Sequence, residues 1–584
     1  MKKTKIVCTI GPASESKEVF KELVINGLNV ARLNFSHGSH EEHLQRIKMI
    51  KEVREELKTP VAILLDTKGP EIRTGKFELP SVDLVEGQEF TLYMDEMMGT
   101  DKGCSISYTE LTNDVGPGDS ILIDDGLIGL EVLEIKDREI LTKVLNGGTV
   151  KNNKGINVPG VIINLPAITE KDASDIKFGI RNGIDFIAAS FIRKKEDVLE
   201  IRKILEDNDA GHIQIISKIE NQEGVDNLDE IIEISDGLMV ARGDLGVEIP
   251  TEEIPLVQKD MIRKCNIACK PVITATQMLD SMIRNPRPTR AETTDVANAI
   301  YDGTDAIMLS GETAAGKYPL EAVKTMAVIA KATENSLDYA KILREKSLTK
   351  EPGVTYAVSH ATCETASALS ATAIMTATSS GFTARKISQF RPKSNIVAVT
   401  TTERVSRQLI LVWGVFPIVA KEVESTDEIF DLCIEEGQKF GYVNEGDLVV
   451  ITAGVPVGVA GATNLMKVHL VGEMIIKGTG IGKIKSSGRA CIVKDANEAR
   501  EKFEDGDIIV CHSSDKDLVP YIERSAGLIT EEGGYTSHGA IVGLNLGKAV
   551  LVGIEDVKDK IRDGQILTID SSRGLAFSGK TREL

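Results

Sequence analysis

The segment IQIISKIENQEGVDNLDEIIEISDGLMVARGDLG, residues 213–246, shows the repeating unit of this chain. Two short apolar runs each end in polar residues and are separated by a longer amphipathic stretch, which is typical of strands and helices that build a parallel sheet. The pattern occurs eight times between residues 5 and 310, with predicted strands at 6–10, 30–34, 62–66, 186–190, 213–218, 238–241, 272–275 and 306–310. Stretches between them, such as 39–58 and 194–209, have helical spacing. The sequence therefore predicts an α/β fold with a closed (β/α)8 TIM barrel.

The rest of the chain indicates three further domains. The gap between the third and fourth predicted strands is too long for a loop, and its Gly- and Pro-rich turns are typical of short β-strands. A second alternating stretch and a final region of strand and turn signals follow the barrel. We expect a barrel domain at 1–69 and 167–345, with a β-barrel lid inserted in it at 70–166. An α/β domain at 346–472 and an extra C-terminal domain at 473–584 should follow.

The composition favours an enzyme that acts on small molecules. The 584 residues include 69 Lys and Arg against 88 Asp and Glu, a formal net charge of −19. Such an acidic surface repels nucleic-acid phosphates and anionic membranes. The apolar run at 6–10 is too short for the core of a signal peptide, and the eight cysteines include no C-x-x-C pair. We expect a cytoplasmic location, with no nucleic acid and no membrane among the partners.

Polar residues end most of the predicted strands, and a βα barrel forms its active site there. Glu220 and Asp244 are hard oxygen ligands suited to Mg2+, and Lys218, on the same strand face as Glu220, suits a phosphoryl group in transfer. Arg32 has a planar fork for phosphate oxygens, and the turn at Gly243 offers backbone N–H groups to a carboxylate. Each residue alone fits a helix cap or a solvated strand end as well. Together they predict a metal-bridged phosphate site.

Seven sequence blocks resemble the pyruvate kinase family in order and spacing. They are ARLNFSHG (31–38), DTKGPEIRTG (66–75), NNKGINVPG (152–160), SKIEN (217–221), MVARGDLGVE (239–248), TATQML (274–279) and MLSGET (308–313). The resemblance runs from residue 1 to about residue 472. It implies transfer of the phosphoryl group of phosphoenolpyruvate to ADP, giving pyruvate and ATP, the final step of glycolysis. It also implies a C domain with effector sites and a homotetramer.

The resemblance implies roles for individual residues. Lys218 matches the lysine that stabilises the phosphoryl group in transfer, Arg32 the phosphate-binding arginine, and Thr276 the threonine associated with protonation of the enolpyruvate. Glu220 and Asp244 match the Mg2+ (or Mn2+) ligands that also hold the substrate. The implied substrate-binding set is Arg32, Lys218, Gly243, Asp244 and Thr276.

A monovalent cation site and a nucleotide site are implied as well. The K+ donors correspond to Asn34, Ser36, Asp66 and the carbonyl of Thr67, which are all oxygen donors. Glu71 stands where K+-dependent members tend to have Glu and independent members Lys, so we expect K+ dependence. The implied contacts to ADP or ATP are Asn34, His37, Arg73 and Lys154, the last delivered by the lid.

Two segments beyond the barrel resemble ligand sites. TATSSGFTAR, residues 376–385, is similar to the family's sugar-phosphate effector loop, although such a sequence is also an ordinary helix entry. It implies a phosphorylated activator bound through Thr378, Ser379, Ser380 and Thr383. GGYTSHGAIV, residues 533–542, is similar to the phosphohistidine swivelling domain of phosphoenolpyruvate-utilising enzymes, and His538 matches its histidine. Because Gly543-Leu544 replaces the usual Ala-Arg, we expect a structural or regulatory domain, with His538 a vestigial phosphohistidine position.

Two other functions stay open at this point. One is another phosphoenolpyruvate-dependent phosphotransferase, which only the C-terminal domain favours. The other is a non-catalytic metabolite sensor. ADP-dependent formation of pyruvate discriminates between all three hypotheses.

Overall fold

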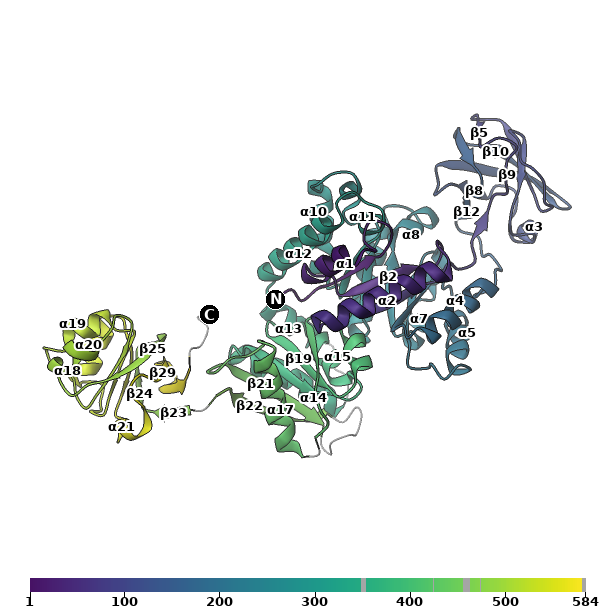
Figure 1. Cartoon of the computed structure of the whole chain (residues 1–584). Coiled ribbons are helices and arrows are strands. Elements are labelled where there is room, and N and C mark those ends of the chain that lie inside the picture. Colours follow the sequence, from purple (N-terminus) through teal and green to yellow (C-terminus); the bar gives the residue numbers. More distant parts are fainter. Residues whose placement is uncertain (348–352, 424, 455–462, 473, 580–584) are drawn as a thin grey trace. The chain divides into compact units, whose positions relative to one another are not determined.

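The computed structural model describes residues 1–347, 353–423, 425–454, 463–472 and 474–579. Figure 1 shows the whole chain, coloured along the sequence. By its internal contacts the chain divides into two compact units. Unit 1 comprises Met1–Lys350, Ala384–Arg391 and Thr402–Val419, and unit 2 comprises Glu351–Thr383, Pro392–Thr401 and Ala420–Leu584. Within the described ranges, no helix is long and apolar enough to cross a membrane.

Unit 1 contains a closed barrel of parallel strands, which confirms the predicted fold class. The strands lie in the order β1-β17-β16-β15-β14-β13-β3-β2, so the first and the last strand of the barrel pair with each other. Every strand begins and ends within one residue of its predicted position, because each is a short apolar run between polar segments. The bounds are β1 Lys5–Thr9, β2 Val30–Asn34, β3 Ala62–Asp66, β13 Phe186–Ala189, β14 Gln214–Ile219, β15 Gly237–Ala241, β16 Val272–Ala275 and β17 Ala306–Leu309.

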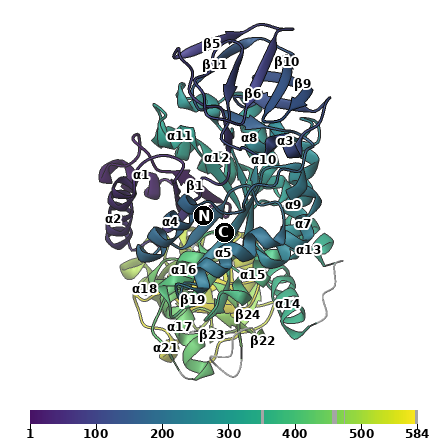
Figure 2. The same ribbon diagram turned by 90° about the vertical axis from the view of Figure 1, so that its right-hand side faces the viewer.

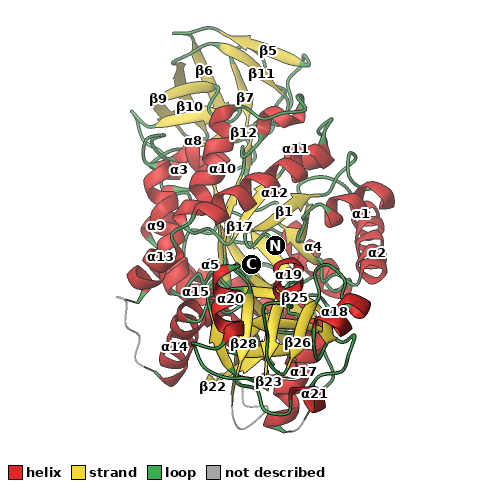
Figure 3. Ribbon diagram, turned by 90° about the vertical axis from the view of Figure 1, so that its left-hand side faces the viewer, coloured by secondary structure: helices red, strands yellow, loops and turns green. Residues whose placement is uncertain are grey.

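Helices surround these strands, as the red ribbons of Figure 3 show. Their apolar faces pack on the outside of the barrel in one large core, while their charged faces are solvated. Capping boxes start α2, α4 and α10 at Ser39, Thr169 and Thr289. The bounds are α1 Lys17–Ile25, α2 His40–Leu57, α4 Glu170–Arg181, α5 Lys195–Glu206, α6 Gln222–Asp226, α7 Leu228–Ile234, α8 Arg242–Glu248, α9 Ile254–Ile267, η1 Asp280–Ile283, α10 Arg290–Asp302, α11 Gly311–Ala314, α12 Pro319–Ser336, α13 Tyr339–Lys346 and α16 Glu403–Leu409.

A second, smaller core fills the inside of the barrel and sets the position of the functional residues. Val30, Leu64, Ala188 and Ile216 belong to this core. Side chains of a strand alternate between its two faces, so the residue two positions further along each strand also points inward. These next residues are Arg32, Asp66, Ser190 and Lys218, at the carboxyl end of the barrel. The apolar interior therefore changes to a polar layer at the predicted site.

The segment between β3 and α4 forms a β-rich insert (Figure 2). Seven strands lie in the order β4-β12-β8-β9-β10-β6-β7, and β11 pairs separately with β5. The sheet curls until its two edges meet, where Gly75 donates to the carbonyl of Ser105 (2.7 Å) and Ser107 to that of Arg73 (2.8 Å). The expected β-barrel thus takes the form of a curled sheet. The bounds are β4 Ile72–Arg73, β5 Ser81–Leu84, β6 Glu89–Tyr93, β7 Gly103–Ser105, α3 Leu111–Asp114, β8 Ser120–Ile123, β9 Ile128–Lys136, β10 Glu139–Val144, β11 Gly148–Lys151 and β12 Gly155–Asn157.

Unit 2 contains two further sheets. In the first, β19, β18 and β21 are parallel and β22 is antiparallel to β21. The second has the order β23-β30-β29-β25-β26-β27-β28-β24, with β25 to β28 parallel in its centre. The bounds are α14 Val354–Ala368, β18 Ala373–Ala377, α15 Phe382–Gln389, β19 Asn395–Thr400, β20 Val415–Val419, α17 Thr426–Lys439, β21 Leu448–Gly454, β22 Thr463–Leu470, β23 Met474–Lys477, β24 Thr479–Ile481, β25 Lys485–Ile492, α18 Ala496–Lys502, β26 Ile508–Cys511, α19 Val519–Arg524, β27 Gly527–Thr530, α20 His538–Asn545, β28 Ala549–Val552, α21 Val557–Lys560, β29 Ile566–Asp570 and β30 Leu575–Ser578; α15 is shared by both units, and β20 belongs to unit 1.

A buried ion pair ties the later segments of unit 1 to the barrel. Asp305, just before β17, accepts hydrogen bonds from the guanidinium of Arg391 (3.1 Å) and from the backbone N–H groups of Trp413 (3.1 Å) and Val272 (3.1 Å). The side chains of Asp305 and Arg391 are 5% and 6% exposed. Loss of the carboxylate would leave a buried cation without its partner.

We expect Asp305→Ala to lower the free energy of unfolding by about 3–5 kcal/mol, the usual effect of breaking a buried pair. The measurement is guanidinium unfolding followed by the fluorescence of Trp413, which is the single tryptophan of the chain. Glu345→Ala, which removes an exposed ion pair with Lys341, is the control and should leave the unfolding midpoint unchanged. Equal midpoints for the two variants would contradict the stabilising role of Asp305.

Candidate active site

Arg32 and Asp66 form the first part of the polar layer at the carboxyl end of the barrel. Their strands are adjacent and parallel, and the Arg32 Nε donates to the Asp66 Oδ2 at 2.6 Å. A second guanidinium nitrogen donates to the hydroxyl of Thr9 on β1 (2.7 Å). Both charged side chains are almost fully buried, so the fork of Arg32 is held in one orientation.

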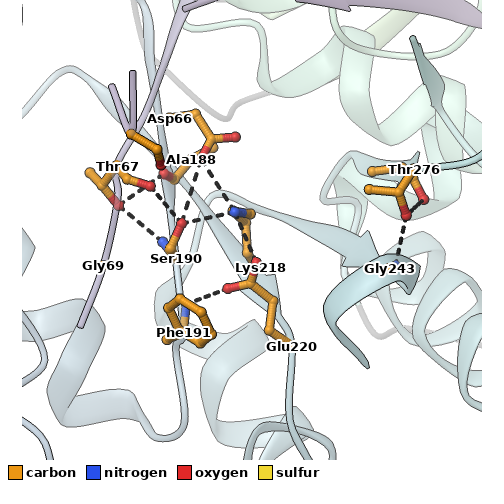
Figure 4. Close-up of polar contacts among 12 residues, drawn as sticks. Asp66, Thr67, Gly69, Ala188, Ser190, Phe191, Lys218, Glu220, Gly243 and Thr276 are labelled. Carbon is orange, nitrogen blue, oxygen red and sulfur yellow. Dashed lines mark hydrogen bonds and ion pairs between the residues drawn. The ribbon is translucent and has the colours of Figure 1, made fainter. Parts of the chain in front are cut away.

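Lys218 completes this layer on the next strands (Figure 4). Its Nζ lies 2.8 Å from the Glu220 Oε1 and 3.3 Å from the Asp66 Oδ1, and it donates to the Ser190 hydroxyl at 2.8 Å. Glu220 also accepts a hydrogen bond from the backbone N–H of Phe191 (2.5 Å). The three strands β3, β13 and β14 therefore bring two carboxylates and a hydroxyl around one ammonium group.

The electrostatics of this cluster keep Lys218 and Asp66 charged. Burial disfavours the ammonium form of Lys218, but the carboxylates of Asp66, Glu220 and Asp244 raise the pKa of Lys218 above its usual value. Burial alone would raise the pKa of Asp66, but the positive charges of Arg32 and Lys218 lower it below the usual range. Two cations thus lie at the barrel mouth, where an anionic substrate would bind.

Glu220 and Asp244 fit a divalent cation. Burial raises the pKa of Glu220 in spite of the neighbouring Lys218, and the negative charge of Asp244 raises it further. A bound cation would relieve this repulsion between two carboxylates. No group of three or more His, Cys, Asp or Glu side chains that could hold a metal occurs in the described part of the chain. The pair suits Mg2+ because this ion takes one or two carboxylates and leaves its other positions to substrate and water.

A cavity of about 330 Å3 lies between the insert and the barrel, and Asp244, one of these two carboxylates, lines it. Glu71 and Asp125 of the insert and Phe191, Asp244 and Glu248 of the barrel are among its lining residues. The insert contacts the barrel directly here, since the Asn157 amide donates to the Glu248 carboxylate at 2.6 Å.

Thr276 and Gly243 lie together at the ends of β16 and β15. The Thr276 hydroxyl accepts a hydrogen bond from the Gly243 N–H (2.8 Å) and donates to the carbonyl of Ala275 (2.7 Å). Thr276 and the next residue, Gln277, both have a positive φ, of 67° and 55°. Arg242 holds this strained turn by donating to the carbonyl of Thr276 (2.7 Å). In this structure the two predicted substrate contacts thus bind each other.

The predicted K+ donors come from the ends of β2 and β3. Asn34 is the register partner of Asp66, and its side-chain oxygen accepts from the backbone N–H of Ser36 (3.1 Å). The carbonyl of Thr67 accepts from the Ser190 hydroxyl (2.7 Å). These oxygen donors are thus close in the fold, and Asp66 is shared with the cluster around Lys218.

The predicted nucleotide contacts of the insert are paired within the insert. Arg73 contacts the Glu71 carboxylate through its Nε at 2.6 Å, and the Lys154 Nζ lies 2.7 Å from the Asp124 carboxylate. His37 lies in the loop between β2 and α2, and its carbonyl oxygen lies 2.9 Å from the Nε2 of His43.

The predicted effector residues lie between β18 and the first turn of α15. The Thr378 hydroxyl accepts from the Gly381 N–H (2.9 Å), and the Thr383 hydroxyl lies 2.5 Å from that of Thr463. Ser379 and Ser380 are exposed. In the C-terminal domain, His538 is the first residue of α20, and its Nδ1 lies 2.8 Å from the hydroxyl of Ser514.

Sequence reasoning missed three residues of this site. Ser190 bridges Lys218 and Thr67, Phe191 supplies an N–H to Glu220, and Arg242 supports Thr276. Ser190 ends a predicted strand, so the alternation along β13 would have placed it in the polar layer. Phe191 acts through its backbone at a positive φ of 55°, and no side-chain pattern reveals that.

Comparison with known proteins agrees with this geometry. The chain matches the families described as pyruvate kinase, barrel domain (residues 1–323), pyruvate kinase, alpha/beta domain (356–469) and PEP-utilising enzyme, mobile domain (503–574). It is 57% identical to a pyruvate kinase of Geobacillus stearothermophilus over 580 residues, 99% of both chains. It is also 57% identical to that of Bacillus licheniformis over 586 residues, the full length of both. The chain belongs to the pyruvate kinase family.

Proposed function

We propose that this chain transfers the phosphoryl group of phosphoenolpyruvate to ADP, with Lys218 as the residue that stabilises the group in transfer. The observation that carries the proposal is the buried cluster of Arg32, Asp66, Lys218 and Glu220 at the barrel mouth. It supplies fixed positive charge for a phosphate and a carboxylate for a bridging metal in one place. Preorganised charge of this kind lowers the barrier, because no reorganisation is needed during the reaction.

The chain's own residues divide the remaining work. Arg32 binds phosphate oxygens of the substrate, and Glu220 and Asp244 hold Mg2+ (or Mn2+), which supplies Lewis-acid neutralisation of the phosphate charge. In the nucleotide complex, Arg73 and Lys154 exchange their carboxylate partners in the insert for phosphates of ADP. Asn34 and His37 contact the nucleotide from the barrel side. Closure of the insert then excludes water from the phosphoryl group.

Thr276 is proposed to guide the proton that the enolpyruvate receives. In the structure its hydroxyl donates to the Ala275 carbonyl, so a role in proton transfer requires rotation of the hydroxyl or a bridging water. Gly243 is proposed to offer its N–H to the substrate carboxylate in place of the Thr276 oxygen. An added Cβ at position 243 would lie 3.4 Å from the Thr276 hydroxyl, in ordinary van der Waals contact.

Lys218→Met should lower kcat by about 100-fold or more and change the binding of phosphoenolpyruvate little, because the lysine acts mainly in the transition state. The measurement is ADP-dependent pyruvate formation coupled to lactate dehydrogenase, with KM for each substrate. Lys203→Met, an exposed lysine on α5, is the control and should retain wild-type turnover. A Lys218→Met enzyme with normal kcat would end this assignment.

The cation requirement is tested in the same assay. EDTA should abolish activity, and Mg2+ or Mn2+ should restore it. Replacing K+ with tetramethylammonium should reduce turnover about tenfold or more if Asn34, Ser36, Asp66 and Thr67 hold K+, since the site then lacks one positive charge. Glu71→Lys should make activity less dependent on K+, whereas Glu78→Lys, the same charge change elsewhere in the insert, should not. Full activity of the native enzyme without K+ would contradict the proposed site.

We further propose that the chain forms a homotetramer, which light scattering would check.

We also propose that a phosphorylated metabolite binds through Thr378, Ser379, Ser380 and Thr383 and activates the enzyme. In a panel of sugar phosphates and nucleoside monophosphates, Ser379→Ala with Ser380→Ala should raise the half-activating concentration about tenfold or more, since the loss of even one charge-assisted hydrogen bond has about this effect. Unchanged activation in the serine variant would remove the effector proposal.

His538→Ala should leave activation intact, and labelled phosphoenolpyruvate should leave no phosphate on His538. A labelled His538 would favour another phosphoenolpyruvate-dependent phosphotransferase.

A further inference from the structure

The insert is joined to the barrel by two chain crossings. The outgoing crossing follows β3 and includes Gly69, and the returning crossing ends at Thr169, where α4 begins. Any movement of the insert against the barrel must change the backbone at these two crossings. The residues that fix the crossings therefore control where the insert presents Arg73 and Lys154.

One buried carboxylate, that of Asp172, holds both crossings. Its Oδ1 accepts a hydrogen bond from the Gly69 N–H (3.1 Å). Its Oδ2 accepts from the N–H (3.1 Å) and the hydroxyl (2.6 Å) of Thr169. Asp172 is 1% exposed. A helix cap needs only the contacts to Thr169, as the capping box of α2 shows, where the Glu42 carboxylate accepts from the backbone N–H of the N-cap residue Ser39 (2.8 Å). The contact to Gly69 is additional.

The outgoing crossing also packs against the residues that bind Lys218 and Glu220. Gly69 has a φ of 72°, and a Cβ there would lie 2.7 Å from the ring of Phe191 and 2.8 Å from the Cβ of Ser190. Ser190 binds Lys218, and Phe191 binds Glu220. Only glycine fits this position, so the crossing is held by Asp172 on one side and by the wall of the site on the other.

The same turn of α4 reaches the nucleotide side of the barrel mouth. The Lys171 Nζ donates to the carbonyl of Phe35 (2.8 Å) and contacts the Asp175 carboxylate (2.6 Å). Phe35 lies in the loop that carries Ser36 and His37. The first turn of α4 thus connects both crossings of the insert with the loop proposed to contact the nucleotide.

We propose that Asp172 is a positioning residue for phosphoryl transfer. Its hydrogen bonds to both crossings set the orientation in which the insert places Arg73 and Lys154 against ADP. This inference rests on the proposed function of those two residues. A shift of about 1 Å in such groups is enough to reduce turnover by as much as about 100-fold. Asp172 itself is not among the residues proposed to contact substrate or metal.

The test is Asp172→Asn, which keeps the size of the side chain and removes one acceptor. An amide cannot accept from Gly69 and Thr169 together, because its NH2 group would face a donor. We expect kcat/KM for ADP to fall about 10- to 100-fold, while KM for phosphoenolpyruvate, bound by barrel residues, stays within about twofold. Hydrogen exchange should accelerate about tenfold in peptides covering 66–72 and 164–172, the factor for one lost charge-assisted hydrogen bond, and stay unchanged in β14.

The control is Asp338→Ala, which removes a helix N-cap of α13 that accepts from Lys341 and lies outside both crossings. It should lower the free energy of unfolding without changing kcat/KM for ADP or the rate of hydrogen exchange in the peptides that cover the crossings. If Asp172→Asn does not fold, Thr169→Val removes the hydroxyl that donates to the Asp172 carboxylate and accepts from the Asp172 N–H, and it should shift both readouts in the same direction by a smaller factor. Wild-type ADP constants, or wild-type exchange at the crossings, in a folded variant would overturn the inference. A native enzyme without ADP-dependent pyruvate formation would instead refute the proposed function and leave the exchange result valid.

Discussion

The candidate active site depends on the pairing of buried charges around Lys218. An ammonium group removed from water loses its proton unless opposite charges compensate, and Asp66 and Glu220 supply them at 3.3 and 2.8 Å. Arg32 stabilises Asp66 in turn, at 2.6 Å. These contacts hold two cations at fixed positions before a substrate enters. A phosphate bound there would meet charges that are already oriented, which is the condition for efficient electrostatic catalysis.

The barrel and the insert contribute to this site in different ways. The barrel supplies groups whose positions are fixed by strand pairing and by a close-packed interior. The insert supplies Arg73 and Lys154, which are held by carboxylates of the insert itself. Their position relative to the barrel depends on the two crossings and on the contacts beside them, such as that between Asn157 and Glu248. The barrel thus carries the groups proposed to act on the phosphoryl group, and the insert carries the proposed nucleotide contacts.

Much of the fold was predictable because the barrel strands are short apolar runs bounded by polar residues. The order of the runs and a helix between neighbours leave few alternatives to a closed parallel sheet. The insert was harder to predict, since its antiparallel strands give weaker patterns and the approach of Gly75 to Ser105 is a contact between distant segments. Among site residues, Arg32, Asp66, Lys218 and Glu220 were identified from strand ends and motifs. The supporting contacts of Phe191, Arg242 and Asp172 were not.

The linear pattern of residues was enough to fix the barrel, the inward positions at its carboxyl end and the chemical class of the site, because strand periodicity is local and repeats with each unit. The pairing of charges was settled only by the folded chain. Lys218 meets Asp66 across 152 positions of sequence, and Asp172 meets Gly69 across 103. Such contacts depend on the register of neighbouring strands and on the path of the insert, and neither leaves a local signature. Backbone N–H groups, which serve Glu220 and Asp172, are present at every residue except proline, so only tertiary structure shows which of them are used.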